Sequence, residues 1–312
     1  MQRAVLLYNP TAGSQHSRRR YQVEAAVAAL RAAGVAAEVV EIDSSEAAGE
    51  QARAAAGKGC DAVIACGGDG TLHAVLQGMV GTPGAAALGV LPMGTGNVLA
   101  KNLGLPLNCS KAAEALLTAK PKPVAVGQID STGEQGERLS RYFLLNAGAG
   151  LDGLGIYGAS HAMKSRMGQA AYYMHGLGLV ARYSFPLFTA EFEDTSGKRR
   201  REQVSEAGAF RVRTLGGLIG SITPGADLLR DDLQLILFKT RRRLRFVQYS
   251  IKAALNWRSE TESVELAHAR ELRCTPLEGA GERIHVQSDG EWLGYLPARI
   301  SMAAEPVQLL FP

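Results

Sequence analysis

The sequence of 312 residues contains few cysteines and no long apolar run. Its four cysteines, Cys60, Cys66, Cys109 and Cys274, have no CxxC spacing, which argues against a disulfide framework and favours a reducing compartment. No stretch reaches the roughly 18 apolar residues that a membrane span needs, and the first apolar run is too short for a signal peptide. We therefore expect a cytoplasmic protein whose membrane contact is peripheral.

Strong charge of one sign and metal-binding patterns are also lacking. The net charge of +4 is too small to indicate nucleic-acid binding, although it suits an anionic substrate or an anionic membrane surface. The six histidines have no metal-ligand spacing, so zinc chemistry has no support. No GxxxxGK[ST] pattern occurs either, which excludes a P-loop nucleotide site.

The first 120 residues alternate between strand and helix patterns with short connections. Strands are expected at residues 5–8, 35–42, 62–66 and 87–91, and helices at 17–33 and 45–56. This order predicts a parallel sheet with helices on its faces, where ligands bind at the carboxyl ends of the strands.

After Pro121 and Pro123 the pattern changes to short apolar segments, which predicts an antiparallel β domain. Its strands are expected to include residues 143–145, 187–192, 209–212, 233–238 and 284–286. Two helical stretches are expected within it, at residues 165–182 and 244–257.

The stretch DAVIACGGDGTLHAVLQG, residues 61–78, changes from a buried strand to a glycine loop and then to a helix. Thr71 suits a helix N-cap, so free N–H groups and the helix dipole are expected to converge on the loop, as at phosphate sites. A carboxylate at Asp69 would repel phosphate unless a cation lies between them or the acid takes part in the chemistry. The alternative is a simple turn residue.

Two further loops follow strands of the same expected sheet. They are NPTAG at residues 9–13 and PMGTGN at residues 92–97. Each could be an ordinary turn, but all three loops are expected at one edge of a parallel sheet, so together they favour a nucleotide site.

At these loops the sequence resembles the diacylglycerol kinase catalytic superfamily, which also contains sphingosine kinases and bacterial lipid kinases. The resemblance spans nearly the whole chain, with the motifs in the family's order. They are Asn9, Pro10 and Gly13, then GGDGT, GTGNVLAKNLGLP, RYFLLNAGAGLDG, PGADLLRDD and SDGEWLGYLP. GGDGT alone is less specific, because NAD kinases and phosphofructokinase-like enzymes share it.

The resemblance implies an ATP-binding α/β domain at residues 1–124, joined again by residues 300–312, and a β-sandwich lipid domain at residues 125–299. Glu291 matches the general base toward the lipid hydroxyl, a task that suits a carboxylate. The stretch QSDGEWLG is also expected to form an Asp-Gly hairpin turn, which would aim this acid. Asp69 is the second expected catalytic acid. The residues expected to bind ATP are Asn9, Pro10, Thr11, Ala12, Gly13, Gly67, Gly68, Asp69, Gly70, Thr71, Leu72, His73 and Thr95.

Two positions depart from the family pattern. Ala125 stands where many bacterial relatives have an aspartate, and Asp130 is a candidate to compensate for it. Relatives have Asp-Asp-Gly in a loop that holds a structural magnesium ion. Here LLRDDLQL lacks the glycine and has Arg230 beside the two candidate ligands, Asp231 and Asp232.

The sequence also allows other interpretations. GAGLDG at residues 148–153 matches GxGxxG, but no acid lies about 20 residues further on and no βαβ unit surrounds it. A NAD kinase is the rival enzyme, although its LGFL-type segment is missing. A non-catalytic lipid- or nucleotide-binding protein is the third alternative. The basic runs at residues 18–20, 198–201 and 239–245 are either solvated faces or contacts to anionic lipid.

We therefore expect an α/β plus all-β protein, with a parallel-sheet nucleotide domain and a C-terminal antiparallel β-sandwich. The expected function is an ATP-dependent lipid kinase that phosphorylates a hydroxyl of a membrane lipid, such as diacylglycerol or a sphingoid base. ATP and Mg²⁺ are its expected cofactors. The expected partner is a membrane lipid and not a nucleic acid, and a homodimer is left open.

Overall fold

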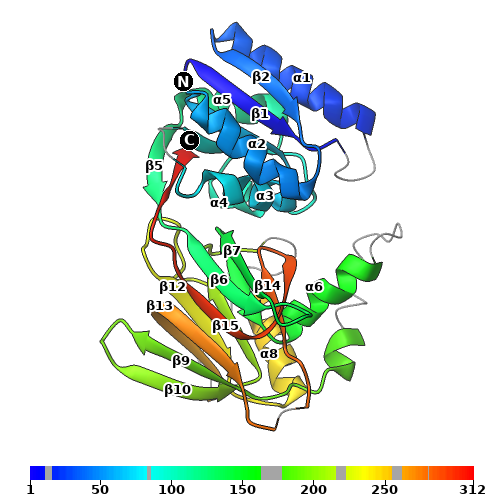
Figure 1. Ribbon diagram of the computed structural model, residues 1–312, viewed down its shortest axis with the longest axis vertical. Coiled ribbons are helices and arrows are strands. Elements are labelled where there is room, and N and C mark those ends of the chain that lie inside the picture. Colours follow the sequence, from blue (N-terminus) through cyan, green and yellow to red (C-terminus); the bar gives the residue numbers. More distant parts are fainter. Residues whose placement is uncertain (11–15, 83–85, 163–177, 216–222, 255–261, 280) are drawn as a thin grey trace. The chain divides into compact units, whose positions relative to one another are not determined.

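The computed structural model describes the chain except for residues 11–15, 83–85, 163–177, 216–222, 255–261 and 280 (Figure 1). The chain divides into two compact units. Unit 1 is built from both ends of the chain, Met1–Val126 and Ala303–Pro312, with a few residues after Arg213, and unit 2 from most of the residues between them.

Unit 1 contains a six-stranded sheet in the order β2-β1-β3-β4-β16-β5. Its strands are β1 (Arg3–Tyr8), β2 (Ala36–Glu41), β3 (Ala62–Gly67), β4 (Ala87–Pro92), β5 (Lys120–Val124) and β16 (Val307–Phe311). The helices are α1 (His16–Ala32), α2 (Ser45–Gly57), α3 (Asp69–Met79), α4 (Val98–Asn102) and α5 (Cys109–Thr118). Strands β2, β1, β3, β4 and β16 run parallel and β5 antiparallel, so the predicted parallel sheet is confirmed.

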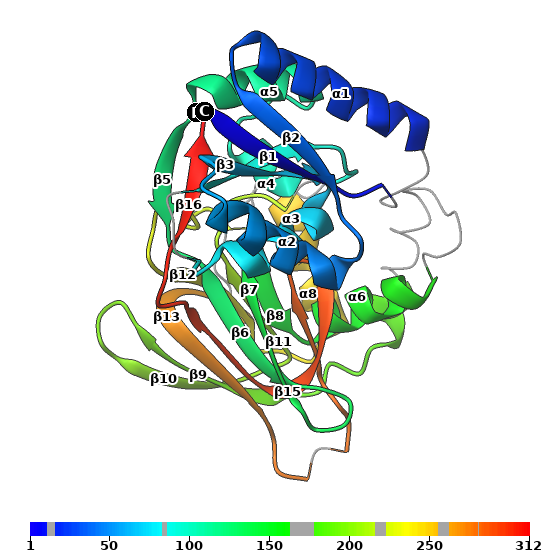
Figure 2. The same cartoon turned by 45° about the horizontal axis from the view of Figure 1, so that its top comes forward.

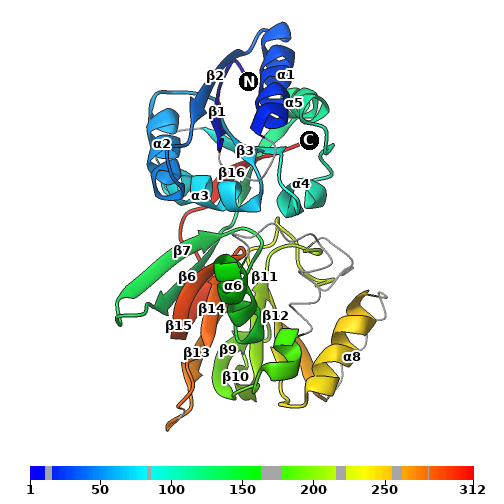
Figure 3. The same ribbon diagram turned by 90° about the vertical axis from the view of Figure 1, so that its right-hand side faces the viewer.

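Helices cover both faces of this sheet, which is why its central strands are apolar throughout. Every residue of β3 and β4 is buried. Figure 3 shows α1 and α5 on one face and α2 and α3 on the other. Helices α2 and α3 cross closely, since a Cβ atom at Gly78 would lie 1.7 Å from the Gly49 carbonyl oxygen. The core therefore fixes the strand ends at which the loops emerge.

Unit 2 contains ten strands in one antiparallel sheet, in the order β10-β9-β13-β12-β11-β8-β14-β15-β6-β7. Its first strands are β6 (Gly127–Thr132), β7 (Arg138–Phe143), β8 (Asn146–Ala149), β9 (Phe188–Asp194) and β10 (Arg199–Val204). They are followed by β11 (Glu206–Phe210), β12 (Leu233–Phe238), β13 (Val264–Pro276), β14 (His285–Ser288) and β15 (Glu291–Met302). The described helices are α6 (Leu151–Ala162) and α8 (Arg243–Ala254).

This sheet folds back on itself, because β13 pairs with β15 as well as with β12 and β9. The long β13 and the β9–β10 hairpin are prominent in Figure 2. A continuous core of small and branched apolar side chains fills the space inside the closed sheet. The predicted antiparallel β domain is thus confirmed, as two layers of one continuous sheet.

Two local predictions are wrong. Residues 143–145 do not form one strand, because β7 ends at Phe143 and β8 begins at Asn146. Helix α3 begins at Asp69 after Gly68, so Thr71 lies in its first turn and is not the N-cap. The reason is that Thr71 packs over the backbone, where a Cβ atom at Gly67 would lie 2.3 Å from its Oγ1.

Other predictions agree with the structure where it describes them. Residues 178–182 are helical, and the rest of the helix expected at 165–182 lies largely outside the described residues. All four cysteines are free and buried. Among the described residues, no helix is both long and apolar enough to cross a membrane.

Candidate active site

Two glycine-containing loops of unit 1 lie against each other at the carboxyl ends of β3 and β4. A Cβ atom at Gly94, in the second loop, would lie 2.5 Å from the Cα atom of Gly68, in the first. Only glycine at residue 94 allows the two backbones to approach this closely. The N–H of Met93 also donates to the Gly67 carbonyl at 2.9 Å. The two loops therefore meet at one edge of the sheet, as the sequence predicts.

Asp69 joins these loops through its side chain. Its Oδ1 accepts a hydrogen bond from the N–H of Val98 at 2.7 Å, and a Cβ atom at Gly96 would lie 2.6 Å from its Oδ2. Asn97, with φ of 48°, makes two 2.8 Å bonds between its amide and the backbone of Gly94. Asp69 therefore satisfies an N–H group at the start of α4 and fixes the second loop. Sequence reasoning missed this task.

The residues expected to bind ATP differ in accessibility. Gly70 and Thr95 are exposed. Thr71, Leu72 and His73 are 6%, 1% and 2% exposed. Thr71, Leu72 and His73 thus pack inside unit 1, whereas Gly70 of the same loop faces solvent.

The third loop is described only at its beginning. Asn9 and Pro10 are half-buried at the end of β1, and the N–H of Asn9 donates to the Cys66 carbonyl at 3.4 Å. This bond links the end of β1 to β3, directly before the GGDGT loop. The predicted ATP-binding residues Thr11, Ala12 and Gly13 lie outside the described residues.

In unit 2, Glu291 is exposed at the first residue of β15, directly after a tight turn. Asp289 and Gly290 form this turn with φ values of 47° and 83°. The Asp289 carboxylate accepts hydrogen bonds from the backbone N–H groups of residues 144–146, each at 2.9 Å, and Asp289 is 7% exposed. Each such bond to a charged group contributes about 1.5–3 kcal/mol. The turn therefore holds its backbone firmly and leaves the Glu291 side chain in solvent.

Gln287 connects this turn to the start of α6. Its Oε1 accepts a hydrogen bond from the N–H of Gly290 at 3.0 Å, and its Nε2 donates to Oδ2 of Asp152 at 2.6 Å. Glu206, in β11, accepts the N–H groups of Leu151 and Asp152 at 2.5 and 3.3 Å. Burial, and then the charge of Asp152, raise the pKa of Glu206 well above its usual value. Acidic groups thus gather behind the Glu291 turn.

A half-buried aromatic cluster follows Glu291 along β15. Trp292 donates its Nε1–H to Nδ1 of His285 at 3.1 Å, and Tyr157 of α6 lies 5.1 Å from Trp292 between ring centroids. Tyr295 contacts both Trp292 and His285, with centroid distances of 5.4 and 5.0 Å. Burial lowers the pKa of His285, so its neutral form accepts the indole N–H at neutral pH.

Asp130, the candidate substitute for the acid missing at Ala125, is engaged elsewhere. It accepts a hydrogen bond from Arg138 at 3.0 Å and lies opposite Arg299 in the sheet. Arg299 lies in the later part of β15, whereas Glu291 begins that strand. The acid joined to the Glu291 turn through hydrogen bonds is Asp152.

The candidate metal ligands Asp231 and Asp232 point to different partners. Asp231 forms an ion pair with Arg270, and its side chain is 78% exposed. Asp232 is paired with Arg230, and its side chain is 8% exposed. Within the described part of the chain, no group of three or more His, Cys, Asp or Glu side chains is arranged to hold a metal ion.

The functional residues that sequence reasoning missed are those that fix the backbone. Asp289, Gln287 and Glu206 all bind N–H groups, as does Asp69. The Asp-Gly pair at residues 289–290 predicts a turn, but no local signal indicated that the Asp289 carboxylate would accept the N–H groups of residues 144–146. No local signal indicated Glu206, because its partners are 55 and 54 residues away.

With this geometry, the comparisons with known proteins agree on one class, the diacylglycerol kinases. Residues 3–129 match the diacylglycerol kinase catalytic domain family. The chain is 24% identical over 313 residues to a diacylglycerol kinase of Bacillus subtilis (strain 168), covering 100% of this chain and 97% of the relative. It is 29% identical over 310 residues to one of Mycobacterium tuberculosis, covering 98% and 94%.

A solved structure shares the whole fold. The crystal structure of a diacylglycerol kinase from Bacillus anthracis str. Sterne matches with a TM-score of 0.75 and 22% identity, covering 100% of this chain and 97% of that chain. The chain is similar to members of the diacylglycerol kinase catalytic superfamily along its whole length, and the match to that family's catalytic domain covers residues 3–129.

Proposed function

We propose that this protein is an ATP-dependent lipid kinase that transfers the γ-phosphoryl group of ATP to a hydroxyl of a membrane lipid, such as diacylglycerol or a sphingoid base. The observation that carries the proposal is the contact between the loops at residues 67–71 and 92–97. Backbone N–H groups at the start of α3 and in these loops suit the phosphates of a nucleotide. The kinase names of relatives aligned along the whole chain support the same reaction.

In the proposed reaction, Glu291 acts as the general base. Its carboxylate takes the proton of the acceptor hydroxyl, the hydroxyl oxygen forms a bond to the γ-phosphorus, and the bond from that phosphorus to the bridging oxygen of ADP breaks. Mg²⁺ bound to ATP would neutralise charge on the phosphates, and Asp69 is the acid proposed to bind that cation. Asp289 and Gln287 would position Glu291 by fixing its turn.

A radiolabelled-phosphate assay tests the proposal directly. Purified protein is incubated with γ-labelled ATP and separate acceptors: diacylglycerol, a sphingoid base, monoacylglycerol, phosphatidylglycerol and NAD. We expect label in one or more lipids. Label in NAD alone would establish the rival NAD kinase, and no label in any acceptor would favour a non-catalytic binding protein.

We also propose that α8 and the residues before it contact an anionic membrane. Leu244 and Ile251 of α8 are 67% and 55% exposed. Arg241, Arg242 and Arg245 are exposed beside them. An exposed apolar and basic face suits the surface of a bilayer, where each Lys or Arg contributes about 1 kcal/mol.

The structure also refines which arginines to test for membrane binding. Arg243 donates its Nε–H to the Tyr183 carbonyl at 3.1 Å, so its replacement would disturb packing as well as charge. Replacing Arg241, Arg242 and Arg245 by Gln is expected to weaken binding to anionic liposomes and to reduce its salt sensitivity, since salt screens charges beyond about 8 Å. Arg199→Gln with Arg201→Gln is the control, because Glu193 and Glu191 already pair with these arginines. Equal binding by all three proteins would contradict the proposal.

A further inference from the structure

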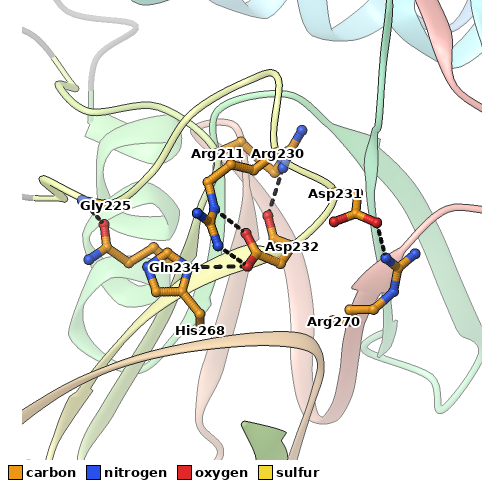
Figure 4. A network of polar contacts seen from close by, with 8 residues as sticks. All are labelled: Arg211, Gly225, Arg230, Asp231, Asp232, Gln234, His268 and Arg270. Carbon is orange, nitrogen blue, oxygen red and sulfur yellow. Dashed lines mark hydrogen bonds and ion pairs between the residues drawn. The ribbon is translucent and has the colours of Figure 1, made fainter. Parts of the chain in front are cut away.

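The loop that contains Asp231 and Asp232 is rich in carboxylate and carbonyl oxygens. Arginine guanidinium groups bind these oxygens. We call residues 223–232 the Asp231 loop. Carboxylates and backbone carbonyls are the oxygen ligands that Mg²⁺ and Ca²⁺ prefer, so the loop's composition fits a metal site. Figure 4 shows that the carboxylates of Asp231 and Asp232 instead point toward arginines.

Asp232 is bound by the Arg230 side chain. Nε of Arg230 donates to Oδ1 of Asp232 at 2.7 Å, and its Nη2 donates to Oδ2, so the pair is bidentate. Nδ1 of His268 lies 3.4 Å from Oδ2, the oxygen that Nη2 of Arg230 also meets (Figure 4). The guanidinium of Arg230 and the imidazole of His268 therefore already occupy the oxygens of this carboxylate.

Arg211 binds the backbone of the Asp231 loop. It is fully buried at 0% exposure, and its Nη1 and Nη2 donate to the carbonyls of Asp232 and Leu228 at 2.7 and 2.8 Å. Burial lowers the pKa of Arg211 to about 10, so the guanidinium stays charged at neutral pH. A fixed cation therefore already binds two of the loop's backbone carbonyls.

The remaining acidic groups are bound in the same way. Arg213 donates to the Ala226 carbonyl at 3.3 Å and to Oδ2 of Asp227 at 3.0 Å. Arg270 pairs with Asp231, which points away from Asp232 (Figure 4). Three carboxylates thus face four guanidinium groups, and a divalent cation would meet a net positive charge.

We infer that the Asp231 loop is held by arginine guanidinium groups and takes no divalent cation. Arg230 and Arg211 supply the positive charge and Arg211 the carbonyl contacts that a metal ion could otherwise supply. The donor set therefore does not fit the magnesium ion predicted at Asp231 and Asp232. This inference concerns the stability of unit 2 and holds whichever lipid is the substrate.

The first test uses the unaltered full-length protein without nucleotide or lipid. Its melting temperature is measured in excess EDTA and during titration with MgCl₂, CaCl₂ and MnCl₂. A ligand that binds only the folded state stabilises it by mass action, so a metal site would appear as a saturable rise. We expect the melting temperature to stay within about 1 °C throughout, which is below the effect of 1 kcal/mol.

The second test removes the cation that binds Asp232. Arg230→Gln leaves a mostly buried carboxylate without its partner, so we expect the melting temperature to fall by about 3–8 °C. The matched control is Arg199→Gln, which removes an exposed pair at 3.8 Å and is expected to change it by about 1 °C or less.

Two results would overturn the inference. One is a saturable rise of more than about 3 °C with Mg²⁺ or Ca²⁺ that EDTA reverses in the unaltered protein. The other is an Arg230→Gln melting temperature equal to that of Arg199→Gln. If Arg230→Gln does not fold, this loss of stability supports the inference that guanidinium groups hold the Asp231 loop. The metal titration of the unaltered protein still decides whether a cation binds.

Discussion

The two units position their candidate site residues by different means. In unit 1, Gly68 and Gly94 allow two backbones to approach, and the exposed surface of the loops is largely backbone. In unit 2, the side chains of Asp289 and Gln287 fix a turn, and one side chain, Glu291, is left exposed. Glycine loops suit a ligand bound by N–H groups, whereas a held turn suits a single acid that must act at one point.

This difference predicts which substitutions change activity alone and which also change stability. Glu291 can change without disturbing its turn, because Asp289 and Gln287 hold the backbone. Asp69 is different, because the same carboxylate lies in the glycine loop at residues 67–71 and holds the N–H of Val98.

Asp69→Asn is expected to abolish turnover while the protein remains folded. Asparagine keeps the Oδ1 acceptor for the Val98 N–H but loses the negative charge that a cation with ATP requires. Asp69→Ala is the comparison, and it is expected to lose stability as well, by about 1 kcal/mol for the missing bond. Activity and thermal unfolding are measured for both. Full activity in Asp69→Asn would mean that the residue only positions the loop.

Glu291→Gln is expected to lower lipid phosphorylation by about 10² to 10⁴, the usual contribution of general-base catalysis. ATP affinity and melting temperature are expected to stay unchanged, since Glu291 is exposed and its turn is fixed by other residues. Turnover and nucleotide binding are measured separately. If more than about a tenth of the activity remains, the base lies elsewhere, and Asp152 is then the first residue to replace.

Asp289→Ala is expected to destabilise the protein by about 3 kcal/mol or more, because three buried N–H groups lose their acceptor. Asp194→Ala is the matched control, since Asp194 also accepts two backbone N–H groups, but in an exposed hairpin. Its unfolding transition is expected to stay close to that of the unaltered protein. Equal losses of stability in both variants would show that burial of the Asp289 turn does not increase its contribution to stability.

His285 is expected to give the smallest effect, seen as a pH dependence. Burial lowers its pKa in the folded protein, so the unfolded chain binds more protons below about pH 6.5. The free energy of unfolding is therefore highest above pH 6.5, where His285 is neutral in both states. It decreases as the pH falls toward the pKa of His285 in the folded protein. His285→Gln is expected to flatten this part of the stability curve, measured by urea unfolding at several pH values.

Trp292 reports the same event by fluorescence. Protonated His285 can no longer accept the indole N–H, so Trp292 emission is expected to change over the same pH range. A Trp257→Phe background makes Trp292 the only tryptophan, since the chain has 2. The partners facing His285 from α6 and β15 are Tyr157 and Tyr295, and Glu282 is the nearby acid. An emission that does not vary with pH would contradict the assignment.

Much of the fold could be predicted because its signals are local. Apolar runs, glycine pairs and helix caps each extend over a few residues, so the alternation of β1 to β4 with helices is readable along the chain. One error occurred where a distant contact overrides local preference, because the N–H groups of Leu144 and Leu145 donate to Asp289 and not to a neighbouring strand. The other has a local cause: Thr71 is a good N-cap by type, but its packing over Gly67, four residues earlier, places it inside α3.

Local patterns in the sequence were enough to predict the two fold classes, the glycine loops and the Asp-Gly turn before Glu291. The groups that these residues bind depend on contacts between distant parts of the chain. Asp69 meets Val98 29 residues away, Asp289 meets backbone at residues 144–146, and Arg211 meets the Asp232 carbonyl 21 residues away. Burial makes an unpaired N–H, carboxylate or guanidinium costly, so each must find a partner, but the partner is set by the path of the whole chain and not by its neighbours in sequence.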